Sequence, residues 1–229
     1  MGELVRFPVN GREGSGYLSV PESGSGPGVL VIQEWWGLVP HIEEVCDRFA
    51  AAGFTALAPD LFDGATTTEP DAAGKLMMAL NVDQAALELQ GGIAYLLASD
   101  AVSSSGVGVV GFCMGGGLAL VVACAEPDAI AAVAPFYGVI PWEHAAPDYS
   151  QLRAPVRGHY AAEDGFFTAD LVRSLERELV DEHGVDAVLT VHEGVDHAFF
   201  NDHRPEVFDA AAAESAWNDT VEFFRSTVR

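Results

Sequence analysis

Lysine is almost absent from this sequence, which has one lysine and ten arginines against 34 acidic residues. The formal net charge at pH 7 is −23. Such a surface repels polyanions, so neither nucleic acids nor anionic membranes are expected partners. Because salt screens charge of this density, we expect a protein suited to a salt-rich cytoplasm. Compositional drift without adaptive meaning remains the alternative.

Cysteine is scarce, and long apolar runs are missing. Three cysteines, an odd number, exclude a disulfide framework, and a reducing, cytoplasmic setting fits them. The longest apolar runs, such as residues 118–125, fall short of the roughly 20 residues that span a bilayer. The N-terminus has neither a basic start nor an apolar stretch, so no signal peptide is expected.

The 229 residues, 49% of them hydrophobic, suit one globular domain covering residues 1–229. After an N-terminal hairpin around Asn10-Gly11, strand patterns alternate with helix patterns. Strands are predicted at 5–9, 17–20, 27–34, 54–58, 107–111, 129–137, 155–160 and 187–192. Helices are predicted at 41–52, 71–80, 82–99, 114–125, 169–183 and 205–228. This alternation predicts the α/β class, a mostly parallel sheet with helices on both faces and a site beyond the carboxyl ends of its strands.

A cysteine lies at the sharpest predicted turn, in the segment Gly111-Phe-Cys113-Met-Gly115 between a strand and a helix. This is the pattern of a nucleophile elbow with sulfur in place of the usual serine oxygen. Glycines flank the nucleophile because a Cβ at either position would collide with the neighbouring strand or helix. The alternative is that Cys113 only packs in the core. Cys46 and Cys124, inside helical patterns, are expected to do so.

Two later loops carry the partners that an elbow nucleophile needs, in the expected chain order. His197 follows the strand at 187–192 and is predicted to take the thiol proton and return it to the leaving group. Asp164 follows the strand at 155–160 and is predicted to orient the imidazole. Glu163 is its competitor, whereas Asp196 is disfavoured because neighbouring residues on an extended loop point apart.

The other histidines are not expected to act in the site. His159 lies in a predicted strand, and surface positions are expected for His41, His144, His183 and His203. Residues 192–197 place their second histidine one residue too late for a zinc-binding H-E-x-x-H helix. No metal and no cofactor are therefore expected.

Glu34 ends the predicted central strand and points to where the site should be, although a solvated loop acid is the alternative. Backbone N–H groups of Trp35 and Met114 are predicted to form the oxyanion hole. Aromatic residues at strand ends are candidates for an apolar pocket wall: Trp35, Trp36, Phe136, Tyr137, Phe166, Phe199 and Phe200.

The chain resembles the dienelactone hydrolases, cysteine-using α/β-hydrolases, over nearly its whole length. The matching segments are 29–37, 53–62, 111–117, 160–164 and 197–199. The resemblance implies an α/β-hydrolase fold and a catalytic triad of Cys113, Asp164 and His197. It also implies that Glu34 pairs with the resting thiol and helps to generate the thiolate. Members of this family open enol-lactones to keto acids in aromatic compound degradation.

The sequence departs from the family where arginines hold the substrate carboxylate. Residues 66–74 contain no arginine, and Asn201 stands about where the second arginine is expected, with Arg204 three residues further on. Asparagine does not replace a bidentate guanidinium clamp. We expect Arg204 to contact substrate, and dienelactone itself is in doubt.

The sequence thus predicts a hydrolase for a small lactone or ester, a monomer or small homo-oligomer with a small-molecule substrate as its partner. One alternative is an amidotransferase-like cysteine hydrolase or glyoxalase, although that superfamily commonly has histidine where Met114 stands. The other is a non-catalytic thiol sensor or interaction protein, for which Cys124, about three helical turns from Cys113, is a poorly placed resolving thiol.

Overall fold

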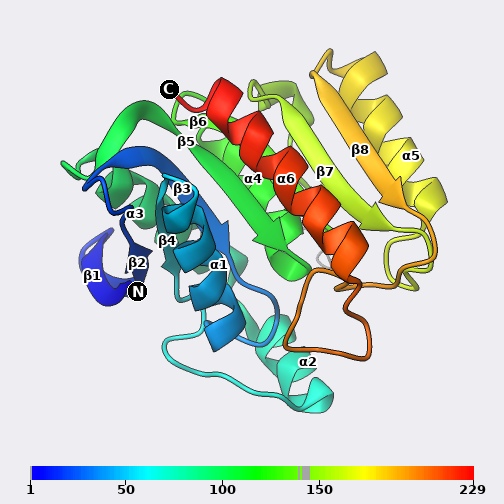
Figure 1. Ribbon diagram of the computed structural model, residues 1–229, viewed down its shortest axis with the longest axis horizontal. Coiled ribbons are helices and arrows are strands. Elements are labelled where there is room, and N and C mark those ends of the chain that lie inside the picture. The colour runs from blue at the N-terminus through cyan, green and yellow to red at the C-terminus, as the bar shows by residue number, and fades with distance from the viewer. Residues whose placement is uncertain (1, 139, 141–144) are drawn as a thin grey trace.

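Eight strands form one twisted sheet in the computed structural model, which describes residues 2–138, 140 and 145–229 (Figure 1). His144 lies outside the described residues. The strand order is β1-β2-β4-β3-β5-β6-β7-β8, and only the contacts of β2 are antiparallel. The strands are β1 (Glu3–Val9), β2 (Arg12–Ser19), β3 (Gly26–Ile32), β4 (Thr55–Pro59), β5 (Val102–Phe112), β6 (Ile130–Phe136), β7 (Val156–Ala161) and β8 (Ala187–His192). The predicted mostly parallel α/β sheet is confirmed.

Helices cover both faces of this sheet, as predicted. They are α1 (Pro40–Ala51), α2 (Pro70–Ala79), α3 (Val82–Leu97), α4 (Met114–Ala125), α5 (Ala169–Arg177) and α6 (Ala210–Thr227). Helices α1 and α6 pack on one face, and α3, α4 and α5 pack on the other. Helix α2 lies beyond the ends of β3 and β5, next to the segment that precedes α6 (Figure 1). The carboxyl ends of the parallel strands therefore open toward α2.

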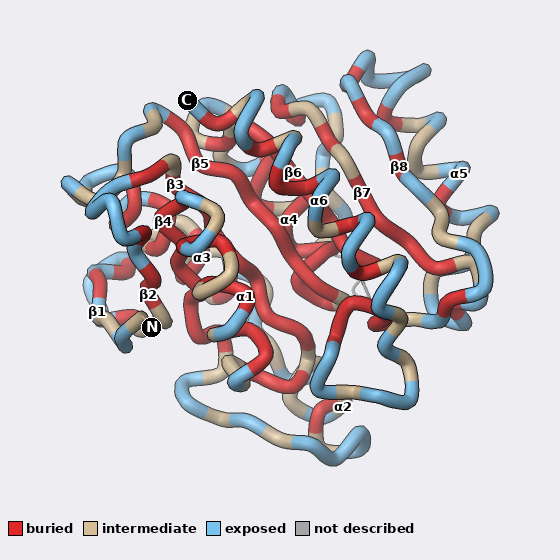
Figure 2. Tube along the Cα trace, in the orientation of Figure 1, coloured by how far each residue is buried: buried red, intermediate tan, exposed pale blue. Residues whose placement is uncertain are grey.

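Two apolar layers, one on each face, bury the sheet. The central strands are buried along most of their length, whereas α2 and the outer turns are largely exposed (Figure 2). Cys46 and Cys124 are both buried, which confirms their predicted core positions. Among the described residues, no helix is both long enough and apolar enough to cross a bilayer.

Several details of the sequence prediction are wrong. Strands β2 and β5 each begin five residues earlier than predicted, at Arg12 and Val102. Helix α6 begins at Ala210 and not at Pro205, because the Asp209 side chain accepts a hydrogen bond from Ala212 N at 2.9 Å and caps the helix there. Helix α5 ends at Arg177 and continues as one π-helical turn over Glu178–Glu182. His41, expected at the surface, is only 1% exposed, because it lies in the first turn of α1 against the sheet.

Candidate active site

Cys113 lies at the sharp turn between β5 and α4, with φ 56° and ψ −121°. A side chain rarely adopts this left-handed region without support from its surroundings. The flanking glycines provide that support. A Cβ on Gly111 would collide with the carbonyl oxygen of Gly115, and one on Gly115 would lie 2.5 Å from that of Gln33. The packing reason given for both glycines is confirmed.

Asp164 and His197 meet across two loops, with 2.7 Å between Oδ2 and Nδ1. The other Asp164 oxygen accepts hydrogen bonds from the backbone N–H groups of Phe166 and Phe167, at 2.7 and 3.1 Å. Burial opposes ionisation of Asp164, but the bonds from His197 and the backbone outweigh it and lower the pKa of this carboxyl. Glu163 is exposed, so the geometry selects Asp164 over its neighbour.

His197 shares its environment with Cys113. Burial disfavours the charged imidazolium, yet the interactions with Asp164 and with the Cys113 side chain outweigh burial and raise the pKa of His197 to about 10. The ring is also fixed by packing, because Tyr137 and Phe166 meet it edge-on at centroid distances of 5.0 and 5.3 Å. One end of the sheet thus brings together Cys113, Asp164 and His197, although 84 positions separate the first from the last along the chain.

Glu34 is completely buried, so it is not a solvated loop acid. Its Oε2 accepts a hydrogen bond from Asn201 Nδ2 at 2.7 Å, and its Oε1 accepts one from the Tyr137 hydroxyl at 3.4 Å. Among the described residues these are the donors to Glu34, and the Cys113 thiol is not one of them. Asn201, where the family resemblance led us to look for an arginine, therefore contacts the buried carboxylate.

An open cavity of about 380 Å³ lies above Cys113. Of the predicted pocket and oxyanion-hole residues, Trp35, Trp36, Met114, Phe166 and Arg204 line it. The remainder of the wall comprises Glu34, Pro70, Met77, Asp196, His197, Ala198 and Val207.

Four aromatic residues that we expected in the cavity wall do not line it: Phe136, Tyr137, Phe199 and Phe200. All four side chains are buried, and the rings of Tyr137 and Phe199 meet edge-on 5.5 Å apart. Tyr137 adopts φ 36° directly after β6, which turns it beneath His197. Tyr137 therefore packs against the imidazole, Phe199 packs against Tyr137, and neither is available to a molecule in the cavity.

Two backbone N–H groups are free to stabilise a developing oxyanion. Met114 is the first residue of α4, where helix geometry leaves the N–H without an intrahelical acceptor. Trp35 N follows β3 and has no hydrogen-bond acceptor among the described residues. The positive end of the α4 dipole adds to the same effect.

Arg204 is the one permanently charged cation in the described cavity wall. Its guanidinium carbon lies 5.4 Å from the centroid of the Trp36 ring, and its Nε donates to Glu206 Oε1 at 2.8 Å. Helix α2 contributes Pro70 and Met77 to the opposite wall. The cavity is thus largely apolar, with a single guanidinium at one side.

Comparison with known proteins gives one consistent picture. The model of the dienelactone hydrolase family matches residues 15–228. The "Protein usf" of Aquifex pyrophilus is 40% identical over 231 residues, which cover 98% of each chain. A protein of Aquifex aeolicus (strain VF5), provisionally named a carboxymethylenebutenolidase, is 35% identical over all of both chains. A crystal structure from Klebsiella pneumoniae, provisionally named a dienelactone hydrolase, superposes with a TM-score of 0.87, 25% identity and 98% coverage of each chain.

Proposed function

We propose, from the premise that this chain belongs to the dienelactone hydrolase family, that it hydrolyses a small lactone or ester with Cys113 as the nucleophile. The observation that carries the proposal is the Asp164–His197 hydrogen bond of 2.7 Å beside a cysteine at a strained elbow. A packing cysteine needs neither the elbow nor an oriented imidazole.

In the proposed reaction the Cys113 proton passes to His197, whose raised pKa favours the imidazolium, and the Sγ thiolate attacks the substrate carbonyl carbon. The oxyanion of the tetrahedral intermediate accepts hydrogen bonds from the N–H groups of Met114 and Trp35. The ring C–O bond then breaks, His197 protonates the leaving oxygen, and an acyl-thioester remains. Water gives a proton to His197 and attacks the thioester, which releases the acid and restores the thiol.

Asp164 is proposed to hold His197 in the required tautomer and to stabilise the imidazolium. Its pKa, lowered through its bond to His197, supports a carboxylate that stays ionised. Glu34 is proposed to assist thiolate formation when substrate enters. It lines the same cavity as Cys113, and a neutral asparagine and a tyrosine, not a cation, hold it in place.

The cavity supports a compact, partly apolar acyl group. Trp36 and Phe166 offer aromatic surface, and Arg204 offers one guanidinium to a substrate carboxylate. The cavity has a single cation at one side, and α2 carries no arginine. We therefore expect activated lactones and esters to be preferred over substrates whose carboxylate is held by two arginines. A thiolate leaves more readily than an alkoxide, so such esters suit it better than amides.

The decisive experiment is a panel of lactones and aryl esters assayed with the wild-type protein and with Cys113→Ala. We expect the variant to lose turnover of every substrate while its circular dichroism stays unchanged. Mass spectrometry of the wild type under rapid quench should detect the acyl group on Cys113. Turnover by Cys113→Ala at the wild-type rate would remove cysteine from the mechanism.

The same assays separate a hydrolase from a thiol sensor. A sensor would show reversible oxidation of Cys113 without turnover of any ester. Glu34→Gln should shift the pH profile of Cys113 alkylation, and an unchanged profile would make Glu34 structural.

We also propose a single domain in a reducing, cytoplasmic setting, as a monomer or small homo-oligomer, because the reaction needs a free thiol and no partner surface.

A further inference from the structure

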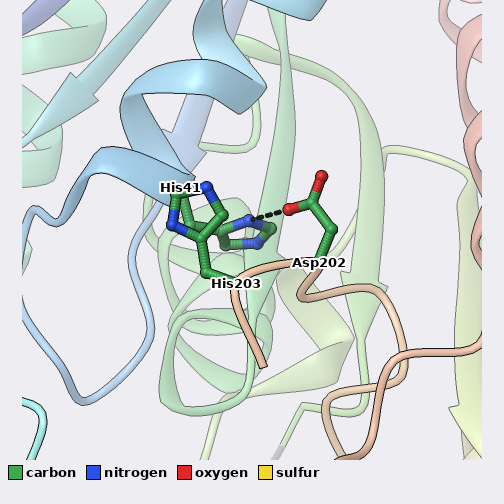
Figure 3. Close-up of side chains that lie close together, drawn as sticks. All are labelled: His41, Asp202 and His203. Atoms are coloured by element: carbon green, nitrogen blue, oxygen red, sulfur yellow. Dashed lines mark hydrogen bonds and ion pairs between the residues drawn. The ribbon is translucent and has the colours of Figure 1, made fainter. Parts of the chain in front are cut away.

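A second cluster of chemically active side chains lies outside the cavity, where α1 meets the segment before α6. His41, Asp202 and His203 each present one donor atom, and these atoms all lie within 4.8 Å of one another. Figure 3 shows the Asp202 carboxylate extended toward the His41 ring, with His203 beside them. The proposed hydrolysis uses none of these three side chains.

His41 is the fixed member of the cluster. Its ring is buried against the aromatic rings of Phe112 and Phe200, at centroid distances of 6.3 and 6.2 Å. This packing holds Nδ1 toward Asp202, whose Oδ1 lies 3.0 Å away. The imidazole is therefore pre-oriented toward the surface from within the core.

His203 is held by a separate acid. Its Nε2 lies 3.0 Å from Glu44 Oε2, and Glu44 is on α1, one turn after His41. Two carboxylates thus accompany two imidazoles at this point. The neighbouring cation, Arg48, stacks over the rings of Phe200 and Trp217 at 4.8 and 4.3 Å.

We propose that His41, Asp202 and His203 bind a divalent transition-metal ion of the zinc, cobalt or nickel class. Two donors bonded to one such ion at about 2.0–2.1 Å lie about 3.3–3.4 Å apart in a tetrahedral site, a few tenths of an ångström more than the 3.0 Å between His41 Nδ1 and Asp202 Oδ1. Two imidazoles and one carboxylate select these ions over magnesium or calcium. Glu44 orients His203 as an outer carboxylate.

The affinity is limited by His41. Its Nε2 has no hydrogen-bond partner among the described residues, and a ring that binds metal through Nδ1 carries its proton on Nε2. That proton is then buried without an acceptor, so we expect micromolar and not nanomolar binding. Water or small anions fill the open positions, because Asp202 and His203 are both partly exposed.

The metal has a structural consequence. It ties residues 198–209 to α1, and the backbone N–H of His203 donates to Asn201 Oδ1 at 3.1 Å. Asn201 in turn bonds Glu34. The bound ion therefore restrains the segment that contacts the buried carboxylate, without entering the cavity.

The test is calorimetric titration of the metal-stripped protein with Zn²⁺, together with Co²⁺ titration followed by visible absorption. Both are carried out in a Cys113→Ser background, because the Cys113 thiol and His197 are themselves metal ligands. We expect one equivalent to bind, a Co²⁺ absorption band to appear, and the unfolding temperature to rise with metal concentration.

Three variants decide the assignment. His203→Gln and Asp202→Asn each remove one ligand at a partly exposed position and should weaken binding at least about 10-fold, while Glu44→Gln should weaken it less. His183→Gln, at an exposed histidine elsewhere, should leave binding unchanged. Absence of binding below about 100 µM, or equal affinity in His203→Gln, Asp202→Asn and His183→Gln, overturns the proposal.

Discussion

Backbone strain at single residues marks the chemically active end of the sheet. Five described non-glycine residues have positive φ, and Cys113, Tyr137 and Ala198 are three of them. Cys113 follows β5 and Tyr137 follows β6, while Ala198 directly follows His197 on the loop after β8. Such conformations persist only where the surroundings enforce them. The strained backbone therefore accompanies a thiol at the cavity and a phenol ring packed against the imidazole.

The raised pKa of His197 makes stability depend on pH. The folded protein binds a proton here up to about pH 10, whereas an unfolded histidine releases it near 6.5. Between these values the native state holds more protons, so its stabilisation is complete below about pH 6.5 and is lost as the pH rises through about 10. Asp164→Asn removes the main cause of this shift and should flatten the decline.

Urea unfolding midpoints of the wild type and Asp164→Asn, measured from pH 6 to pH 10, check this expectation. The two curves should converge at alkaline pH. Parallel curves would contradict the coupling between His197 and Asp164. The same variant should lose about 10²–10⁴-fold in kcat/KM, because the imidazole is no longer held in the required tautomer.

The proposed reacting residues are predictable from the sequence, but some of the residues that support them are not. Cys113 has a local signal in its flanking glycines, and Asp164 and His197 follow from chain order. Asn201 is 167 residues from Glu34, and no local sequence pattern predicts the hydrogen bond between them. The burial of His41 depends on Phe112 and Phe200, which are remote in the chain, so the sequence alone predicts a surface position for it.

At the scale of elements, the join between β5 and α4 depends on close backbone contact. Gly115→Ala should destabilise the protein by about 1–3 kcal/mol, because the added Cβ meets the carbonyl oxygens of Ile32 and Gln33 at the end of β3. This loss outweighs the gain in helix propensity, which is about 1 kcal/mol for Gly→Ala. Chemical denaturation measures the difference.

Gly165→Ala is the matched control for that substitution. A Cβ at Gly165 meets nothing within 4 Å, and its φ lies outside the left-handed region. We expect its unfolding midpoint to equal that of the wild type. A Gly115→Ala protein as stable as the control would show that the elbow tolerates a side chain.

Element boundaries followed from the sequence wherever the signal was local. The predicted turn between β5 and α4 and the predicted strand 187–192 match the structure. At both places the spacing of apolar residues and the turn residues indicate the same boundary. The sequence predicts that α6 starts at Pro205, because proline is a typical first helical residue. The backbone N–H of Asp209 instead donates to Phe199 O at 3.0 Å, which holds 205–209 outside the helix.

At the scale of the whole molecule, a net charge of −23 opposes compaction through self-repulsion. Several ion pairs, such as Arg6–Glu13 and Arg173–Asp170, lie on exposed surface and contribute little. We therefore expect the thermal unfolding midpoint to be higher in molar KCl than in dilute buffer. Sucrose of equal osmolality is the control for solute exclusion. A midpoint unaffected by KCl would leave the acidic composition without an adaptive role.

The segment 198–209 follows His197 on the same loop and has two kinds of residue. Arg204 and Val207 line the cavity wall, whereas Asn201 holds Glu34 and lies behind the wall. If the proposed function holds, changes at the first two positions alter which acyl groups fit and leave the thiol, imidazole and aspartate in place. A mutational library restricted to Arg204 and Val207 therefore explores new substrates at less risk to turnover than one that includes Asn201.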